Sequence, residues 1–404
     1  MRAALGALVP RCPESRPVTA DVDEPSRGLR AATWALRAQF FVTGGLFATW
    51  GVHVPNVKAH YGLGEHALAL AMMASGVGSV VALLYAGRVL ARHPPRRVVP
   101  LLGIVCTLAI GSLLLPGRYA WLLVLMLAYG VAGALFDVAV NDEASTIEQR
   151  AGRPLMSGFH AMFSLGGMAG AGAWSVLASA GVSPVEHLAG AAVFLAGVAM
   201  GASTFMLRQQ RHGASAGSAS LSLPRGPLLL LGLLAAMGLI GEGALYDWSV
   251  LYVRQELAAP SATASLAYAS FSGAMAAGRF GGDWVRARMT PAALVRASGA
   301  LAAIGMGLAL ALPHPWAAIA SFGLVGLGFS NVVPVLFSAA ARVPGVAPAH
   351  GIAAVSSVGY FGMMVGPPVI GFIAQASSLT TGLLVVVAFA GIVAGFARRA
   401  LGAR

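Results

Sequence analysis

The chain has 404 residues, of which 57% are hydrophobic and only 10% are charged, and its mean hydropathy is +0.77. A soluble globular domain carries roughly 25% charged residues, and a soluble fold this apolar would leave too much hydrophobic surface in water. The composition therefore excludes an ordinary soluble enzyme and a disordered protein. It also excludes a nucleic-acid binder despite the net charge of +12, because the arginines fall in short clusters between long apolar runs.

The first 32 residues differ from the rest of the chain. They hold Pro10, Pro13, Pro17 and Pro25 among mixed charges, without the apolar core that a signal peptide needs. We expect residues 1–32 to form a disordered cytoplasmic tail.

Twelve apolar runs follow, separated by Pro, Gly or charged residues. A helix needs about 20 apolar residues to cross a bilayer core of about 30 Å. The runs predict an all-α integral membrane protein with twelve transmembrane helices at approximately residues 33–57, 67–91, 97–115, 119–142, 155–182, 186–207, 227–253, 262–286, 291–313, 316–341, 349–376 and 378–398.

Basic residues are unevenly distributed between the two sides that these spans define. With the N-terminus inside, all of them except Lys58, Arg118 and Arg254 lie in or beside cytoplasmic segments. This is the positive-inside pattern, so we expect both termini in the cytoplasm. The predicted organisation is a six-helix half at 33–207, a flexible cytoplasmic linker at 208–226, a second six-helix half at 227–398 and a cytoplasmic tail at 399–404.

Motifs of the first half recur in the second half. Residues 45–50 (GLFATW) match residues 243–248 (GALYDW) at an offset of 198, which makes Trp50 and Trp248 equivalent. Residues 130–136 match residues 323–329 at an offset of 193 through two glycines and a phenylalanine. Parallel six-helix repeats place a substrate site near the membrane midplane, between the halves.

The loop after the second predicted helix resembles a signature of the major facilitator superfamily, G-x-x-x-D-R-x-G-R-R. The first half keeps Gly87, Arg92 and Arg96 but lacks the aspartate. The second half carries the glycines and basic residues together with an aspartate one residue late: Gly278, Gly282, Asp283, Arg286 and Arg288.

Further motifs are similar to a bacterial branch of that superfamily that includes MosC-like proteins, near the sugar porters. They are residues 136–141 (FDVAVN), 157–160 (SGFH), 242–248 (EGALYDW) and 328–334 (GFSNVVP). The resemblance covers about residues 33–398. It implies the twelve-helix fold of this superfamily, secondary transport, and a place in the bacterial cytoplasmic (inner) membrane.

Ionisable residues at membrane depth are costly, so each one is a functional candidate. Asp137 and Asn141 share a face of the fourth predicted helix, and His160 lies at comparable depth on the fifth. These three side chains could form one polar cluster. It would either bind protons or substrate, or clamp the two helices together.

The seventh predicted helix carries two acids, Glu242 and Asp247. They are five residues apart, about 140° around an ideal helix, so both face one cavity only if the helix is distorted. Glu242 has no basic residue one turn away, and we therefore expect it to carry the coupling proton. Asp247 would act as its outer relay or as the ion-pair partner of Arg254.

Other candidates are less specific. His53 is a pH-sensitive gate residue or a hydrogen-bonded packing group, and Trp50 and Trp248 either stack on a ring of the substrate or fill gaps between helices. Asn331 completes the set assigned to the substrate or proton pathway. For a cytoplasmic latch that breaks and reforms during transport, the candidates are Arg88, Arg279, Asp283 and Arg286.

These features together predict a secondary active transporter that moves a small polar solute by alternating access, coupled to protons. The alternatives are a drug or metabolite efflux pump and a non-transporting sensor of the same fold. No sequence motif of an enzyme or of ATP hydrolysis is found, and the two cysteines, Cys12 and Cys106, fit no metal motif. We expect no cofactor, no metal and no nucleic acid, a monomer, and contacts with membrane lipid.

Overall fold

The computed structural model describes residues 23–115, 117–207 and 225–402. Most of the predicted tail and linker lie outside these ranges. All regular secondary structure in the described residues is helical. The helices are α1 (Asp23–Tyr61), α2 (Glu65–Arg92), α3 (Pro95–Gly111), α4 (Tyr119–Ala151), α5 (Met156–Ser179), α6 (Pro184–Ser203), α7 (Pro227–Gln255), α8 (Ser261–Phe280), α9 (Gly282–Arg286), α10 (Pro291–Ala311), α11 (Pro315–Phe329), α12 (Val332–Ala340), α13 (Pro348–Ala376) and α14 (Leu379–Leu401).

Local sequence explains where several of these helices begin. Pro95, Pro184 and Pro315 each occupy the first position of a helix, where a proline costs no hydrogen bond. At the start of α6, Ser183 and Glu186 form a complete capping box. The proline-marked breaks expected from the sequence at these positions are confirmed.

Nine segments of the described residues are long and apolar enough to cross a membrane, with α11 and α12 together forming one of them. Helices α1, α3 and α8 are not among the nine. Helix α3 has only 17 residues. The protein is thus an all-helical membrane protein, while the count of twelve spans stays a prediction.

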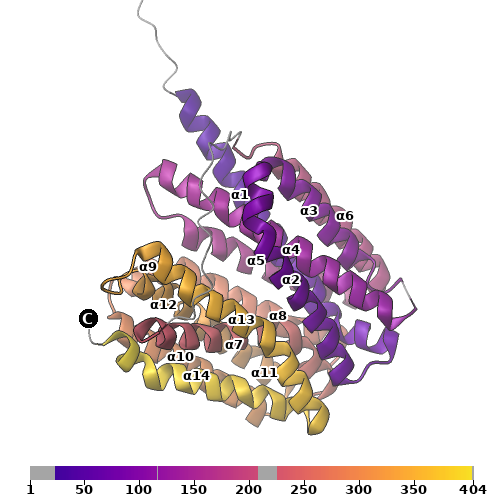
Figure 1. Cartoon of the computed structure of the whole chain (residues 1–404). Coiled ribbons are helices and arrows are strands. Elements are labelled where there is room, and N and C mark those ends of the chain that lie inside the picture. Colours follow the sequence, from indigo (N-terminus) through magenta and orange to yellow (C-terminus); the bar gives the residue numbers. More distant parts are fainter. Residues whose placement is uncertain (1–22, 116, 208–224, 403–404) are drawn as a thin grey trace, which may run out of the picture.

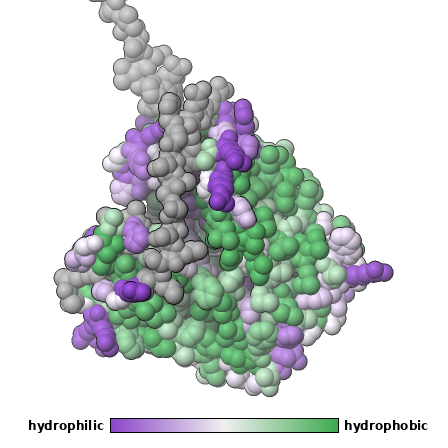
Figure 2. All heavy atoms as spheres, viewed as in Figure 1, coloured by the Kyte–Doolittle hydropathy of each residue, from purple (hydrophilic) through white to green (hydrophobic). Residues whose placement is uncertain are grey.

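Large apolar side chains cover the outside of the helix bundle. Leu101 and Leu108 on α3 are exposed, as are Val193 and Phe194 on α6. Figure 2 shows a broad hydrophobic area on the visible face, with hydrophilic residues gathered toward its margins. Such a surface is unfavourable in water and suits the hydrocarbon core of a bilayer.

The helices pack in two sets. Helices α1–α6 contact one another mainly through the pairs α1/α5, α2/α4 and α3/α6, and α7–α14 through α7/α13, α8/α11 and α10/α14. In Figure 1 the first set runs from indigo to magenta and the second from salmon to yellow. We call them the first helix group (α1–α6) and the second helix group (α7–α14).

Close glycine contacts recur in the same order in both groups. A Cβ on Gly166 would meet the backbone of Phe41 in the α1/α5 pair, and a Cβ on Gly362 would meet Ala236 in the α7/α13 pair. A Cβ on Gly130 would likewise meet the backbone of Ser75 (α2/α4), and one on Gly326 that of Phe271 (α8/α11). The residue numbers of corresponding positions differ by 195 or 196.

This contact register supports an internal repeat but changes its alignment. An offset of 195 along the first helix of each group pairs His53 with Trp248, and Trp50 with Leu245. The sequence match that paired the two tryptophans at an offset of 198 is therefore wrong. It followed the shared Gly and Trp of two short motifs and not the packing of the helices.

Candidate functional site

An ion pair lies where three helices meet. Arg279 Nη2, on α8, lies 2.9 Å from Glu242 Oε1, on α7, and both side chains are largely buried. Arg279 Nη1 donates to Ser164 Oγ at 2.8 Å and to the carbonyl oxygen of His160 at 3.4 Å, both on α5. Tyr246, one turn from Glu242, donates from its hydroxyl to Glu242 Oε1 at 3.3 Å. Arg279 therefore links the two helix groups.

This geometry corrects the expectation that Glu242 has no basic partner. Arg279 is 37 residues from Glu242 in the chain, so no helical spacing relates the two. The sequence placed Arg279 at the cytoplasmic boundary, whereas its side chain reaches Glu242 inside the bundle. A buried carboxylate with this partner is held as an ion pair.

The second acid of α7 faces a different helix. Asp247 Oδ1 accepts a hydrogen bond from Trp50 Nε1 of α1 at 3.0 Å. The expected ion pair with Arg254 is not present in the described residues. Arg254 Nη1 donates instead to the carbonyl oxygen of Ala259 at 2.8 Å, because it lies near the end of α7 and closes the turn that follows. Glu242 and Asp247 point in different directions from one continuous helix, as their spacing predicted.

A cluster of aromatic rings surrounds this part of α7. The Phe47 ring centroid lies 5.5 Å from that of Phe163 and 6.4 Å from those of Tyr129 and Tyr246. The Tyr246 ring is 5.1 Å from Tyr268. Sequence reasoning missed these rings as a group, because five helices contribute them.

Asp137 and Asn141 are brought together as predicted. Asn141 Nδ2 donates to Asp137 Oδ1 at 3.1 Å and to the Asp137 carbonyl oxygen at 2.9 Å. His160 does not join them by any hydrogen bond in the described residues. Its ring packs against Phe40 of α1, with the two ring centroids 5.2 Å apart, and lies near Arg279.

Tyr360 of α13 was not predicted as a site residue. It is close enough to Asp137 and to Glu242 to interact with both electrostatically, yet 48% of its surface is exposed. Asp137 itself is only partly buried. Polar groups from α4, α7 and α13 thus lie near one another, and neither Asp137 nor Tyr360 is fully buried.

His53 belongs to a separate chain of polar groups in which both histidines are buried. Its Nε2 lies 2.8 Å from His187 Nδ1, and Asn56 Nδ2 lies 2.9 Å from its Nδ1. The Trp174 ring packs against both imidazoles, with its centroid 4.5 Å from that of His53 and 4.8 Å from that of His187. This arrangement matches the packing alternative for His53. Trp248 is also fully buried, near Gly371 of α13.

The latch candidates have different surroundings. Arg286 Nη2 donates to Ser157 Oγ, at the start of α5, at 3.0 Å, and so joins the two helix groups. Arg88 is exposed and lies over the Tyr85 ring of its own helix. The side chain of Asp283 is not among those described. Asn331 separates α11 from α12 and donates to the Gly278 carbonyl oxygen at 3.2 Å.

The opposite end of the bundle carries polar contacts that the sequence did not predict. Lys58, the single lysine of the chain, bonds to Glu65 at the start of α2 and donates to Gln255 Oε1 of α7 at 2.8 Å. The amide nitrogen of His66 lies 3.4 Å from Gln375 Oε1 of α13. We call this end of the bundle the Lys58 end, and the other the Arg286 end.

Helices α2 and α13 are close only toward the Lys58 end. A Cβ on Gly371 would meet Ala69 and the backbone of Glu65, and a Cβ on Gly76 would meet Met364. One turn further, Val80 and Tyr360 would face each other in the same register. They are instead 39% and 48% exposed, so the two helices separate toward the Arg286 end.

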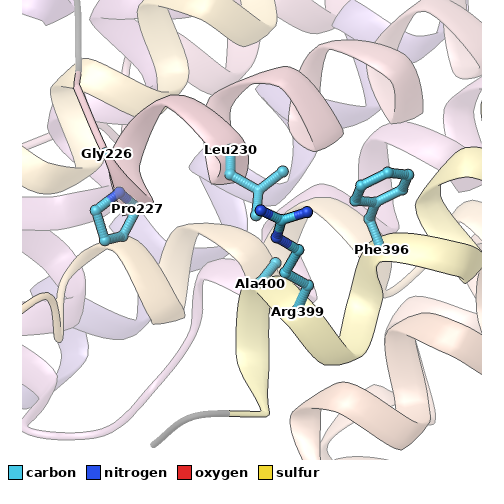
Figure 3. Close-up of a pocket in the computed structure, with 6 residues that line it drawn as sticks. All are labelled: Gly226, Pro227, Leu230, Phe396, Arg399 and Ala400. Carbon is cyan, nitrogen blue, oxygen red and sulfur yellow. The ribbon is translucent and has the colours of Figure 1, made fainter.

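A surface pocket lies apart from all of these groups. It is lined by Gly226, Pro227 and Leu230 at the start of α7 and by Phe396, Arg399 and Ala400 of α14 (Figure 3). Arg399 is its one ionisable side chain. We assign it no role in the site.

Comparison with known proteins identifies the class. The model described as Major Facilitator Superfamily matches residues 36–367, so the chain belongs to this family of membrane transporters. Within it, the chain is 35% identical over 345 residues to an uncharacterized MFS-type transporter of Yersinia pestis, covering 85% of this chain and 89% of that protein. It is 30% identical over 373 residues to the membrane protein MosC of Rhizobium meliloti, covering 91% and 89%.

Solved structures share the fold at low sequence identity. The D-xylose-proton symporter superposes with a TM-score of 0.73 at 12% identity, covering 91% of this chain and 97% of that one. A mutant of the nucleoside transporter NupG superposes with a TM-score of 0.71 at 11% identity, covering 91% of this chain and 99% of that one. The resemblance to a MosC-like branch of the superfamily is thus confirmed, and the protein is a multi-pass membrane transporter and not an enzyme.

Proposed function

We propose that the protein is a secondary active transporter that moves a small polar solute by alternating access, with protons as the coupling ion. The observation that carries the proposal is the position of Arg279. Its guanidinium binds Glu242 of its own helix group and donates to Ser164 of the other, so a relative movement of the groups must break a hydrogen bond of a buried, charged side chain.

The repeated packing supports twelve membrane spans in two six-helix halves. In the 195/196 register α1 corresponds to α7, α2 to α8 and α3 to α10. Helices α1, α3 and α8 each occupy a place whose counterpart is apolar enough to span a bilayer. Counting these three with the nine gives the expected twelve.

The shape of the α2/α13 pair supports alternating access. The pair is closed at the Lys58 end and separated at the Arg286 end, which is what one open state of a rocking-bundle transporter requires. With the Arg286 end in the cytoplasm, this state of the protein faces inward. In an outward-facing state the Lys58 contacts would be broken and the Arg286 end closed, with Asp283 and Arg88 available as latch residues there.

We assign the coupling proton to Asp137. A residue that carries a proton must lose its charge during the cycle, and Glu242 cannot do so without leaving Arg279 buried and unpaired. Among the described residues, the Asp137 carboxylate is hydrogen-bonded only to the neutral amide of Asn141. Glu242, Asp247, His160, Trp50 and Asn331 stay on the proposed pathway as neighbours of the substrate or of the ion pair.

The proposal includes a setting. The protein lies in the bacterial inner membrane as a monomer surrounded by lipid, with both termini in the cytoplasm, and needs no cofactor. The nucleoside and D-xylose carried by the structural neighbours are small polar solutes, in line with the proposed substrate class.

A thermal-shift screen followed by counterflow tests this proposal. The purified full chain is screened against a library of small polar metabolites, and each stabilising compound is then loaded into proteoliposomes. We expect at least one to drive counterflow of its labelled form. A compound that stabilises the protein without counterflow would favour the sensor, and net proton-driven extrusion would favour the efflux pump.

A further inference from the structure

We infer that the aromatic cluster beside Asp247 binds an organic cation, a class of solute carrying a protonated or quaternary amine. This inference rests on the proposed transport function, because it specifies the solute that the site would accept. It begins from the charge of Asp247. In the described residues this carboxylate accepts a hydrogen bond from the Trp50 indole, which is neutral, and no basic side chain pairs with it.

The buried guanidinium of α8 already has a partner. Arg279 is paired with Glu242 at 2.9 Å and donates to Ser164 as well, so its charge is compensated before Asp247 is counted. Asp137, deeper toward the Arg286 end, is a second acid for which the described part of the chain supplies no basic partner. A cationic solute can pair with these acids, whereas an anionic solute would be repelled by them whenever they are ionised.

Three of the aromatic rings of the cluster lie close together. Phe47, Phe163 and Tyr246 form a triangle with centroid separations of 5.5, 6.0 and 6.4 Å. Phe47 and Phe163 are only partly buried, as is Asp247, whereas Tyr246 and Tyr268 form a buried wall behind them. Aromatic faces attract a cation through their quadrupole, most strongly when the cation is desolvated.

Asp247 is close enough to the Tyr268 ring of the cluster to interact with it electrostatically, so a cation bound there is recognised by both charge and ring contact. A neutral polyol could stack on the same rings, but it would leave the Asp247 charge uncompensated in a region of low dielectric. The rings come from α1, α5, α7 and α8, so a bound cation would touch both helix groups. Ligand binding would thereby be coupled to their relative position.

A set of three probes of the same shape isolates the charge. Choline, 3,3-dimethyl-1-butanol and 3,3-dimethylbutanoate each carry three methyl groups on a quaternary nitrogen or carbon. They are cationic, neutral and anionic, respectively. Thermal unfolding of the purified full chain in detergent is measured with each probe at equal ionic strength. We expect choline to raise the unfolding temperature by several degrees at millimolar concentration, and the other two to have no effect.

Variants connect the shift to the cluster. Asp247→Asn should abolish the choline shift, and Phe47→Leu should reduce it several-fold. Glu186→Gln is the matched control, because it removes an exposed acid and keeps the capping function of that residue at the start of α6. It should leave the shift unchanged. Phe47→Leu also covers the case in which Asp247→Asn does not fold, because it keeps the Asp247 carboxylate and removes a ring of the cluster.

Three results would overturn the inference: no shift with choline, an equal shift with its neutral isostere, or an undiminished shift in Asp247→Asn. Failure of the transport proposal would look different. Choline would then bind with the expected variant dependence, but no compound would drive counterflow in proteoliposomes.

Discussion

Arg279 Nη2 lies 2.9 Å from Glu242 Oε1, and its other terminal nitrogen donates to Ser164 of the opposite helix group. We predict that breaking this pair from either side is costly. Glu242→Gln leaves a buried guanidinium and Arg279→Gln a buried carboxylate, so each should destabilise the protein by about 3 kcal/mol. Unfolding in detergent, followed by heat or by denaturant, measures the effect.

The double variant E242Q/R279Q serves as the control for this pair. It removes both charges, so it should be clearly more stable than the sum of the two single losses predicts. Additive losses would mean that the two charges do not interact in the folded protein.

A second prediction uses two glycines on one helix. A Cβ on Gly130 would overlap the carbonyl oxygen of Ser75 on α2, whereas a Cβ on Gly133 would meet nothing within 4 Å. Gly130→Ala should therefore separate α2 from α4 and cost about 1–3 kcal/mol. Gly133→Ala should be neutral or stabilise the protein by up to about 1 kcal/mol, because alanine is the better helix former.

Both glycine variants can be compared by their thermal unfolding temperatures in detergent. The contrast between them removes the general effect of a glycine substitution in α4. If the two variants unfolded at the same temperature, the close α2/α4 packing described above would be incorrect.

A third prediction concerns membrane orientation. In a background with both native cysteines replaced by serine, Arg288→Cys lies at the Arg286 end and Arg254→Cys at the Lys58 end, and both positions are exposed. With the arginine-rich end in the cytoplasm, an impermeant thiol reagent added outside intact cells should label only Arg254→Cys. Permeabilised cells, in which both should react, provide the control. Labelling of Arg288→Cys in intact cells would reverse the proposed topology.

The sequence predicted contacts within a helix better than contacts between helices. The four-residue spacing of Asp137 and Asn141 gave their hydrogen bond, and the five-residue spacing of Glu242 and Asp247 gave their divergent directions. Both follow from 3.6 residues per turn. Composition and Pro-marked breaks likewise placed the helices, because hydrocarbon leaves the backbone few alternatives.

Partners far apart in the chain could not be found in this way. Trp50 and Asp247 are 197 residues apart, and their contact depends on how α1 crosses α7. Local spacing instead suggested Arg254 as the partner of Asp247, since the two share a helix face. In the structure the Arg254 side chain does not reach Asp247. It donates instead to a carbonyl oxygen of the turn that follows α7.

The last prediction separates Asp137 from Glu242 as the proton carrier. One charge that crosses 100 mV is worth about 2.3 kcal/mol, enough for roughly a 50-fold solute gradient. Asp137→Asn keeps the shape of the side chain and removes only the titratable group, so the helices should still exchange between states. We therefore expect it to abolish accumulation against a gradient while counterflow of a compound found by the thermal-shift screen continues.

Glu242→Gln should slow both processes, because Arg279 is then buried without a partner and every movement of the two groups is affected. Paired measurements of accumulation and counterflow in proteoliposomes decide between the two acids. Accumulation that persists in Asp137→Asn, with proton uptake unchanged, would show that another group carries the proton.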